Sequence, residues 1–227
     1  MSLLSRLEAA LERVAEGGAE RVFGGRLDLV AVGQELYNQA VEVSRPGGAG
    51  PLAPNAFGVH LSVADYGHFQ GEVEALQARY AVSLWGRLRE SGYGLTAPPS
   101  VLITPLDELP AGSFRVETAF RETVPAFSLS NLTGRATVHR LETPATVGRD
   151  MECSLRIDGG GVSRRHARFI WEHGRFAVVD LNSKNGTFVN GVRVPQAALE
   201  PGDVVTLGDA ALRFEPEIGG LPMGDDR

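Results

Sequence analysis

The sequence is poor in cysteine, in lysine and in long apolar runs. Cys153 is the single cysteine among 227 residues, which excludes an internal disulfide and is typical of a reducing compartment. No run of about 18 apolar residues occurs, so we expect no direct insertion into a membrane. The opening MSLLSRLEAALERV lacks the basic segment and apolar core of a signal peptide and indicates an amphipathic helix. We therefore expect a cytoplasmic protein, recruited to a membrane only through partners.

Basic residues are also scarce in the first half of the chain. Residues 1–130 contain 10 basic and 15 acidic residues, whereas residues 137–216 contain 10 of each. A nucleic-acid-binding face needs a surplus of basic side chains, and a small RNA-binding domain would show a basic GxxG loop. Neither feature is present, so the sequence predicts no nucleic-acid partner.

Residues 1–117 mix helical and extended patterns. The expected elements are, in order, an amphipathic helix at the N-terminus, a helix over roughly 27–43, a strand over 57–63, a helix from Asp65 to about Glu90, and strands near 100–105 and 112–118. Ser62 before Asp65 is a typical helix start, and Ser91-Gly92 is a typical stop. This order predicts a small α+β domain.

The texture of the sequence changes after residue 117. Residues 118–135 show no sustained periodicity and are interpreted as an inter-domain linker. Over residues 136–216, short β-rich runs alternate with turn signals such as Asn185-Gly186, which predicts an all-β sandwich. The glycine-rich tail, residues 217–227, is expected to be disordered. The expected fold class is therefore two domains, an N-terminal α+β domain and a C-terminal β-sandwich.

Three segments of the β-region carry the groups that bind anions. They are Gly148-Arg149-Asp150, VSRRHA at 162–167 and DLNSKNGT at 180–187. Each falls in an expected loop, and loops at one end of a sandwich commonly carry recognition residues. Lys184, the only lysine of the chain, lies in the third loop. Its ammonium group can reach the rim of a bound phosphate; the alternative is chance at a solvated turn.

The order GR, SRxH, SxNGT closely resembles the forkhead-associated (FHA) domain, one of the domain families that read phosphorylated motifs with arginine clusters. The resemblance covers residues 136–216. It implies that Arg149 and Ser163 grip the phosphate of a phosphothreonine and that Arg164 adds charge at the rim. It further implies that Asn185 bonds the peptide backbone just beyond the phosphothreonine. A guanidinium fork suits two of the three phosphate oxygens.

The same resemblance assigns supporting roles to three more residues. Gly148 and Gly186 would allow tight turns, and His166 would brace the loops through hydrogen bonds. His166 follows Ser163 by three residues, but no acidic partner or nucleophile elbow accompanies the pair. Paired cysteines and HxxxH spacing are lacking, and Gly159-Gly160-Gly161 has no GK[ST] ending. We therefore expect no enzyme, no cofactor and no metal.

Residues 1–117 resemble the N-terminal domain of bacterial FhaA-type proteins. The resemblance is carried by LEAALERVAEGGAERVFGGRL, PLAPNAFGVHLSVADY and SFRV. It implies a non-catalytic adaptor in serine/threonine-kinase signalling, often tied to cell-envelope growth, whose phosphothreonine partners are kinases or their substrates. The segment 118–135 is much shorter than the linkers of the long-linker members. The alternative function is a phosphorylation-independent interaction scaffold.

Two threonines of the expected linker are candidate phosphorylation sites. Thr118 and Thr123 each follow a glutamate. Once phosphorylated, either can occupy the FHA pocket of its own chain or of a neighbouring molecule, which would make a switch. The alternative is that both are ordinary linker threonines.

Overall fold

The computed structural model describes residues 27–48, 50–133 and 137–218. Within them the chain divides into two compact units, built chiefly from residues 27–121 and 122–217. The expected N-terminal helix and all but the first two residues of the expected tail lie outside the described residues. Among the described helices, none is long and apolar enough to cross a membrane.

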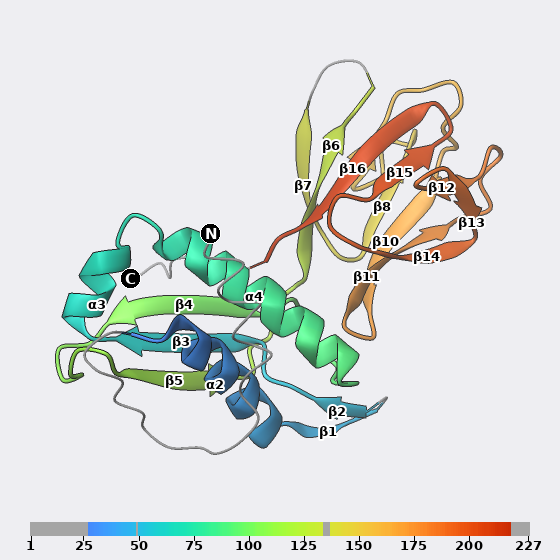
Figure 1. Cartoon of the computed structure of the whole chain (residues 1–227). Coiled ribbons are helices and arrows are strands. Elements are labelled where there is room, and N and C mark those ends of the chain that lie inside the picture. The colour runs from blue at the N-terminus through green and yellow to red at the C-terminus, as the bar shows by residue number, and fades with distance from the viewer. Residues whose placement is uncertain (1–26, 49, 134–136, 219–227) are drawn as a thin grey trace. The chain divides into compact units, whose positions relative to one another are not determined.

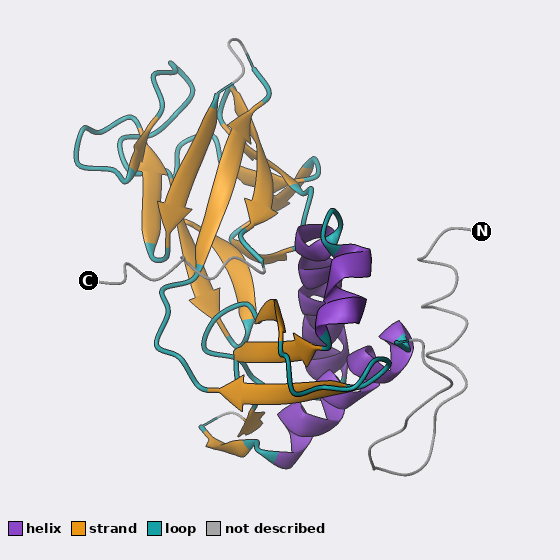
Figure 2. Ribbon diagram, turned by 90° about the vertical axis from the view of Figure 1, so that its left-hand side faces the viewer, coloured by secondary structure: helices purple, strands orange, loops and turns teal. Residues whose placement is uncertain are grey.

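The first unit combines three helices with a three-stranded sheet (Figures 1 and 2). Its elements are α2 (Leu29–Glu42), β1 (Arg45–Gly47), β2 (Gly50–Leu52), β3 (Ala56–Leu61), α3 (Val63–Phe69), α4 (Val73–Glu90), β4 (Ser100–Pro105) and β5 (Phe114–Ala119). The sheet has the order β4-β3-β5, with β4 parallel and β5 antiparallel to β3. Helices α3 and α4 form the crossover that a parallel pair requires. The α+β prediction is confirmed.

Local sequence signals explain where these helices begin and end. Asp28 caps α2 by accepting hydrogen bonds from the backbone N–H groups of Val30 and Ala31. Ser62 caps α3 by accepting from the N–H of Asp65. Helix α4 ends at Glu90, with Ser91 as its C-cap and Gly92 following at a φ of +80°, as the sequence predicts.

The expected single helix from Asp65 to Glu90 is wrong in one respect, because it is two helices. Residues 70–72, Gln-Gly-Glu, separate α3 from α4, and the N–H of Glu72 turns back to the carbonyl of Phe69. Gly71 weakens the helix at this point, since glycine in a helix interior costs about 1 kcal/mol relative to alanine. The apolar spacing continues across this break, so periodicity alone does not reveal it.

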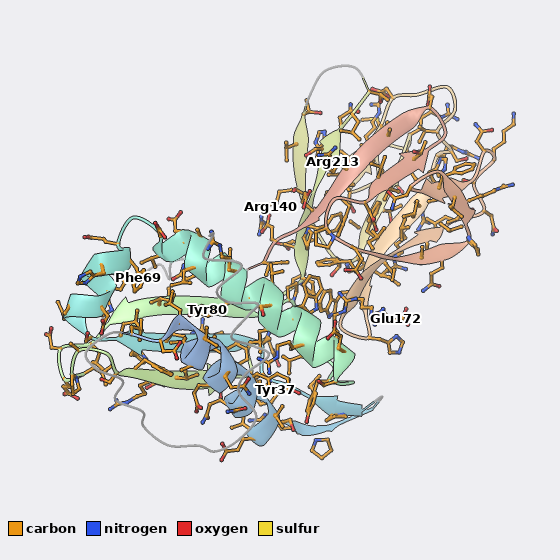
Figure 3. The ribbon with its side chains drawn as sticks, in the orientation of Figure 1. Tyr37, Phe69, Tyr80, Arg140, Glu172 and Arg213 are labelled. Carbon is orange, nitrogen blue, oxygen red and sulfur yellow. The ribbon has the colours of Figure 1, made fainter. Side chains whose placement is uncertain are left out.

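Tyr80 ties the two long helices of the first unit together. Its ring is 2% exposed, and its hydroxyl donates a 2.7 Å hydrogen bond to the carbonyl of Leu29 at the start of α2 (Figure 3). Burial raises the pKa of Tyr80 above its ordinary range, so the hydroxyl stays a donor. The apolar face of α4 is buried as the helical spacing predicts, through Val73, Leu76, Leu84 and Leu88.

The second unit is a sandwich of two sheets. Its strands are β6 (Ala126–Asn131), β7 (Val138–Glu142), β8 (Ala145–Gly148), β9 (Leu155–Arg156), β10 (Ala167–Glu172), β11 (Arg175–Asp180), β12 (Thr187–Val189), β13 (Val192–Val194), β14 (Gln196–Leu199), β15 (Val204–Leu207) and β16 (Ala210–Pro216). One sheet has the order β14-β11-β10-β8-β9 and the other β13-β12-β15-β16-β6-β7. The predicted β-sandwich is confirmed.

Four phenylalanines form the centre of the sandwich. Phe127 and Phe214 come from the six-stranded sheet, Phe169 and Phe176 from the five-stranded sheet, and all four are fully buried. The rings of Phe127 and Phe169 stack at 5.2 Å, and Phe176 meets Phe214 edge-on at 5.3 Å. Such pairs add stability beyond the area that they bury. The cluster joins the two sheets and leaves the loops at the sandwich ends free to vary.

The expected linker over residues 118–135 is wrong for most of its length. Its first two residues complete β5, and β6 pairs with both β16 and β7, burying Phe127 and Leu129. Only residues 120–125 lie between β5 and β6. The segment AFSLSN alternates, but its two large apolar residues follow a proline and make too short a pattern to stand out. Strand β14, of sequence QAAL, was missed for a similar reason.

Candidate functional site

The three segments that are predicted to bind an anion meet because the strands that carry them are neighbours. Strand β10 pairs with β8 on one side and β11 on the other, antiparallel to both. The residues after β8, those before β10 and those after β11 therefore share one edge of the five-stranded sheet. Sequence spacing brings the segments to loops, and the sheet order brings the loops together.

Backbone hydrogen bonds join the first two loops directly. The N–H groups of Arg149 and Asp150 donate to the carbonyls of Ser163 and Arg164 at 3.0 and 2.9 Å. Gly148 allows this approach, because a Cβ at its position would collide with the carbonyl oxygen of Arg164. Arg149 is thus held against the backbone of the second loop.

His166 lies between the second and third loops. It is fully buried, its Nδ1 accepts from the N–H of Ser163 at 3.1 Å, and its Nε2 is 3.1 Å from the carbonyl oxygen of Gly186. Since Nδ1 accepts, the ring proton is on Nε2, which donates to Gly186. Both ring nitrogens are therefore occupied by backbone groups, and neither is left to take a proton from a substrate.

An aspartate that sequence reasoning missed organises the third loop. Asp180 accepts from the Ser183 and Thr187 hydroxyls at 2.6 and 2.7 Å and from the Ser183 N–H at 3.0 Å. Burial alone would raise the pKa of Asp180, but these hydrogen bonds outweigh it and lower the pKa. The Ser183 hydroxyl also accepts from the N–H of Gly186. The signal is in the sequence, as an aspartate three residues before a serine in a turn.

Ser163 has a hydroxyl proton to spare. Its Oγ accepts a 3.0 Å hydrogen bond from the backbone N–H of Lys184, which ties the second loop to the third. A serine hydroxyl carries one donor and two acceptor sites, so the donor is still available. Ser163 is half-buried and can donate to an anion resting on the loops.

Three basic residues adjoin Ser163 along the backbone: Arg149 and Lys184 donate backbone N–H groups to its carbonyl and its hydroxyl, and Arg164 follows it in sequence. Arg149, Arg164 and Lys184 are all exposed, and none has an ion-pair partner among residues 27–48, 50–133 and 137–218. Unpaired charges of one sign on adjoining loops create a potential that attracts the opposite charge. The structure therefore gathers three unpaired cations and a hydroxyl donor at one end of the sandwich.

Asn185 presents the oxygen of its amide. Its Nδ2 donates a 2.8 Å hydrogen bond to the carbonyl of Gly161, and its Oδ1 has no donor among the described residues. The oxygen can therefore accept the N–H of an approaching peptide. Gly186 follows with a φ of +85°, and a Cβ there would collide with the guanidinium of Arg193. Arg193 thus covers the turn that holds Asn185.

Cys153 is half-buried between the first and second loops. Its thiol donates to the carbonyl of Arg164 at 3.3 Å, and burial raises its pKa, so the thiol stays protonated. In the part of the chain that the structure describes, no cluster of histidine, cysteine and acidic residues could hold a metal ion.

The two candidate phosphorylation sites lie in different surroundings. Thr118 is half-buried in β5, opposite Phe57 of β3, whereas Thr123 is exposed in the segment 120–125. The structure does not bring Thr123 to the three loops. The turn before β16 adjoins the loops, whereas Pro216 at the other end of β16 pairs with Phe127 near the start of β6.

Comparison with known proteins shows two matched regions. The model of the FHA domain family matches residues 145–208, and that of the FhaA N-terminal domain family matches residues 4–117, half of the chain. Glycogen accumulation regulator GarA of Mycolicibacterium smegmatis is 45% identical over 75 residues, which are 33% of this chain and 48% of GarA. The FHA domain-containing protein FhaA of Mycobacterium tuberculosis is 39% identical over 66 residues, 29% of this chain and 12% of FhaA.

A solved structure is similar to part of this chain. The FHA domain of FhaA, complexed with the intracellular domain of Rv3910, is 32% identical and corresponds to 39% of this chain and 99% of that one, with a TM-score of 0.37. The alignments with GarA relatives span about half of the length of those proteins. The two family matches lie in the order α+β domain, then FHA domain, and they account for both units. The chain therefore belongs to the FHA-domain proteins of the FhaA type.

Proposed function

We propose that this protein is a non-catalytic signalling adaptor whose second unit binds phosphothreonine-containing segments of other proteins. The observation that supports this most is that three exposed cations without ion pairs among the described residues, Arg149, Arg164 and Lys184, lie on the same adjoining loops as the spare hydroxyl donor of Ser163. A phosphothreonine supplies nearly two negative charges and three acceptor oxygens, which this arrangement complements. FHA domains as a class read phosphorylated motifs in this way.

Each residue has a distinct part in the proposed complex. Arg149 offers its guanidinium fork to two phosphate oxygens, and Ser163 donates its hydroxyl to the third. Arg164 and Lys184 add charge at the rim, and Asn185 accepts the peptide N–H that follows the phosphothreonine. Charge-assisted hydrogen bonds contribute about 1.5–3 kcal/mol each. After the entropy cost of ordering the peptide is subtracted, a few such bonds give a binding free energy of about −8 kcal/mol, which is a dissociation constant in the micromolar range.

The supporting residues keep this arrangement in place before the ligand arrives. His166 connects the second and third loops, Gly148 lets the first loop contact the second, and Gly186 forms the turn after Asn185. A site whose loops are already ordered loses less entropy on binding.

The partners in this proposal are phosphothreonine proteins of serine/threonine-kinase signalling, either kinases or their substrates, acting in the cytoplasm and linked to cell-envelope growth. The match of residues 4–117 to the FhaA N-terminal domain supports a second docking function in the first unit. The alternative is a scaffold that binds its partner without phosphate. The unpaired cations favour the phosphate reader, because a neutral partner would leave them without counter-charges.

A titration separates the two functions. A phosphothreonine peptide and its unphosphorylated twin are titrated into the full chain by calorimetry, and Arg149→Ala is compared with the control Arg175→Ala. Arg175 is exposed and unpaired among the described residues, and it begins β11 at the end of the sheet away from the loops. We expect phosphorylation-dependent binding that Arg149→Ala weakens at least about tenfold and Arg175→Ala leaves unchanged. Equal affinity for both peptides would refute the phosphate reader.

We further propose that Thr123, rather than Thr118, is the phosphorylated threonine, and that it is read by a neighbouring molecule. Thr123 is exposed, whereas Thr118 is half-buried in β5. The carbonyl of Pro125 accepts a hydrogen bond from the N–H of Thr143, which fixes the segment that contains Thr123 to the start of β6. The length of β16, seven residues or roughly 20 Å, separates that end of the sandwich from the three loops. Kinase treatment followed by mass spectrometry and light scattering is expected to show modified Thr123 and self-association that Arg149→Ala abolishes. An unmodified Thr123 would end the proposal.

A further inference from the structure

A second charged feature lies at the same end of the sandwich, on the turn between β15 and β16. Gly208 and Asp209 form this two-residue turn, because Leu207 pairs with Ala210. Gly208 has a φ of +64°, and a Cβ at its position would collide with the backbone of Gly161. The turn therefore rests directly on the glycine run 159–161, and the sheet fixes where Asp209 lies.

The glycine run itself has no side chains, so Asp209 supplies the charged group where the turn and the run meet. Its Oδ1 is 2.5 Å from the place where a Cβ would stand on Gly159 and 3.1 Å from the equivalent place on Gly161. Any larger residue at Gly159 would displace the carboxylate. Asp209 is exposed, and among the described residues it has neither an ion-pair partner nor a side-chain hydrogen bond. Asp158, by comparison, is paired with Arg156 at 2.6 Å.

Asp209 and Asn185 both approach Gly161, on the side where a Cβ would stand. Asn185 Nδ2 donates to the carbonyl of Gly161. The same nitrogen is 3.4 Å from the position that a Cβ on Gly161 would occupy. In the proposed complex, Asn185 binds the backbone just after the phosphothreonine. A peptide that continues from Asn185 over Gly161 passes beside the carboxylate of Asp209.

We propose that Asp209 selects phosphothreonine ligands that carry a lysine or arginine on the C-terminal side of the phosphothreonine. This inference rests on the proposed function and specifies the charge of the ligand residues that follow the phosphothreonine. The site is then bipolar, with cations toward the phosphate and one anion toward the residues that follow. An acidic residue at that place meets an uncompensated like charge, so the carboxylate rejects acidic ligands as well as attracting basic ones.

The test uses one phosphothreonine peptide in which lysine, alanine or glutamate is placed, in turn, at each of the first four positions after the phosphothreonine. Each peptide is titrated into the full chain by fluorescence anisotropy at low and at high salt. At one position we expect lysine to bind about 2- to 5-fold more tightly than alanine, and glutamate more weakly, with a preference that shrinks as salt rises. Asp209→Asn is expected to remove the preference, and Asp209→Lys to invert it.

The control is Asp107→Asn, which neutralises an exposed aspartate of the first unit without an ion-pair partner among the described residues and changes the net charge equally. It is expected to leave the preference as in the wild type. Loss of the preference in this control would show an effect of net charge and overturn the inference. Phosphorylation-dependent binding with equal affinities for the lysine and glutamate peptides would overturn the inference alone. Equal affinities for phosphorylated and unphosphorylated alanine peptides would overturn the proposed function as well.

Discussion

Replacing His166 with alanine would remove the side chain that holds the second and third loops together. The ring is fully buried and satisfies two backbone groups, the N–H of Ser163 and the carbonyl of Gly186. A buried polar group left without a partner costs about 1–3 kcal/mol, or about 2–6 kcal/mol for the pair. Ser163 is half-buried, so water reaches its N–H in the variant. We therefore expect a loss of about 2–4 kcal/mol in the free energy of unfolding of the second unit.

The chain offers a direct assay, because it has two tryptophans, one in each unit. Trp85 lies in α4, and Trp171 lies in β10, edge-on to Phe176 at 4.7 Å. In a Trp85→Phe background, urea denaturation followed by fluorescence reports the second unit alone. His139→Ala is the matched control, since His139 is half-buried on β7 and its ring has one hydrogen bond among the described residues, to Thr137. A His166→Ala loss within about 0.5 kcal/mol of the control would refute the bracing role.

Three further predictions concern packing, pH and the first unit. Gly148→Ala places a methyl group against the carbonyl of Arg164, and we expect a loss of about 1–3 kcal/mol in thermal or urea unfolding, together with weaker phosphopeptide binding. The lowered pKa of Asp180 adds stability that is fully present above the ordinary aspartate pKa of 3.8 and is lost as the pH falls through the folded-state pKa. We therefore expect Asp180→Asn to weaken the pH dependence of the free energy of unfolding on the acidic side, and an unchanged pH dependence would contradict this. Tyr80→Phe removes the hydrogen bond to Leu29 and is expected to lower the stability of the first unit by about 1 kcal/mol, measured by Trp85 fluorescence in a Trp171→Phe background.

Much of the fold is predictable because its signals are local. The helix caps Ser62 and Ser91-Gly92, and the hairpin turn Asn190-Gly191, each act within a few residues, and the structure places turns or helix ends there. Strand β6 was missed because its own apolar pattern is short and because one of its partners, β16, lies more than 80 residues later in the chain. The break at Gly71 was missed because the apolar spacing on its two sides happens to stay in phase.

The composition of the site is also readable in the sequence, but its geometry is not. Three short motifs predict which polar groups belong together, and their spacing predicts loops. The contact between Asp209 and the glycine run joins residues that lie about 50 positions apart, and it exists only because the β15–β16 turn rests on Gly161. Asp180 was missed for another reason. Its partners are close in sequence, but aspartate and serine occur in most turns, so the pattern has little specificity.

The pairing of β6 with β16 has a consequence for how this domain can be used in evolution and engineering. Its first and last strands are neighbours, and the N–H of Glu217 still donates to the carbonyl of Ala126 beyond their last pair, so the sandwich is entered and left at one point (Figure 1). That point is at the end of the sandwich away from the three loops of the candidate site. A domain built in this way can be inserted into another polypeptide, or joined to a longer linker on either side, without changing the three loops at its opposite end.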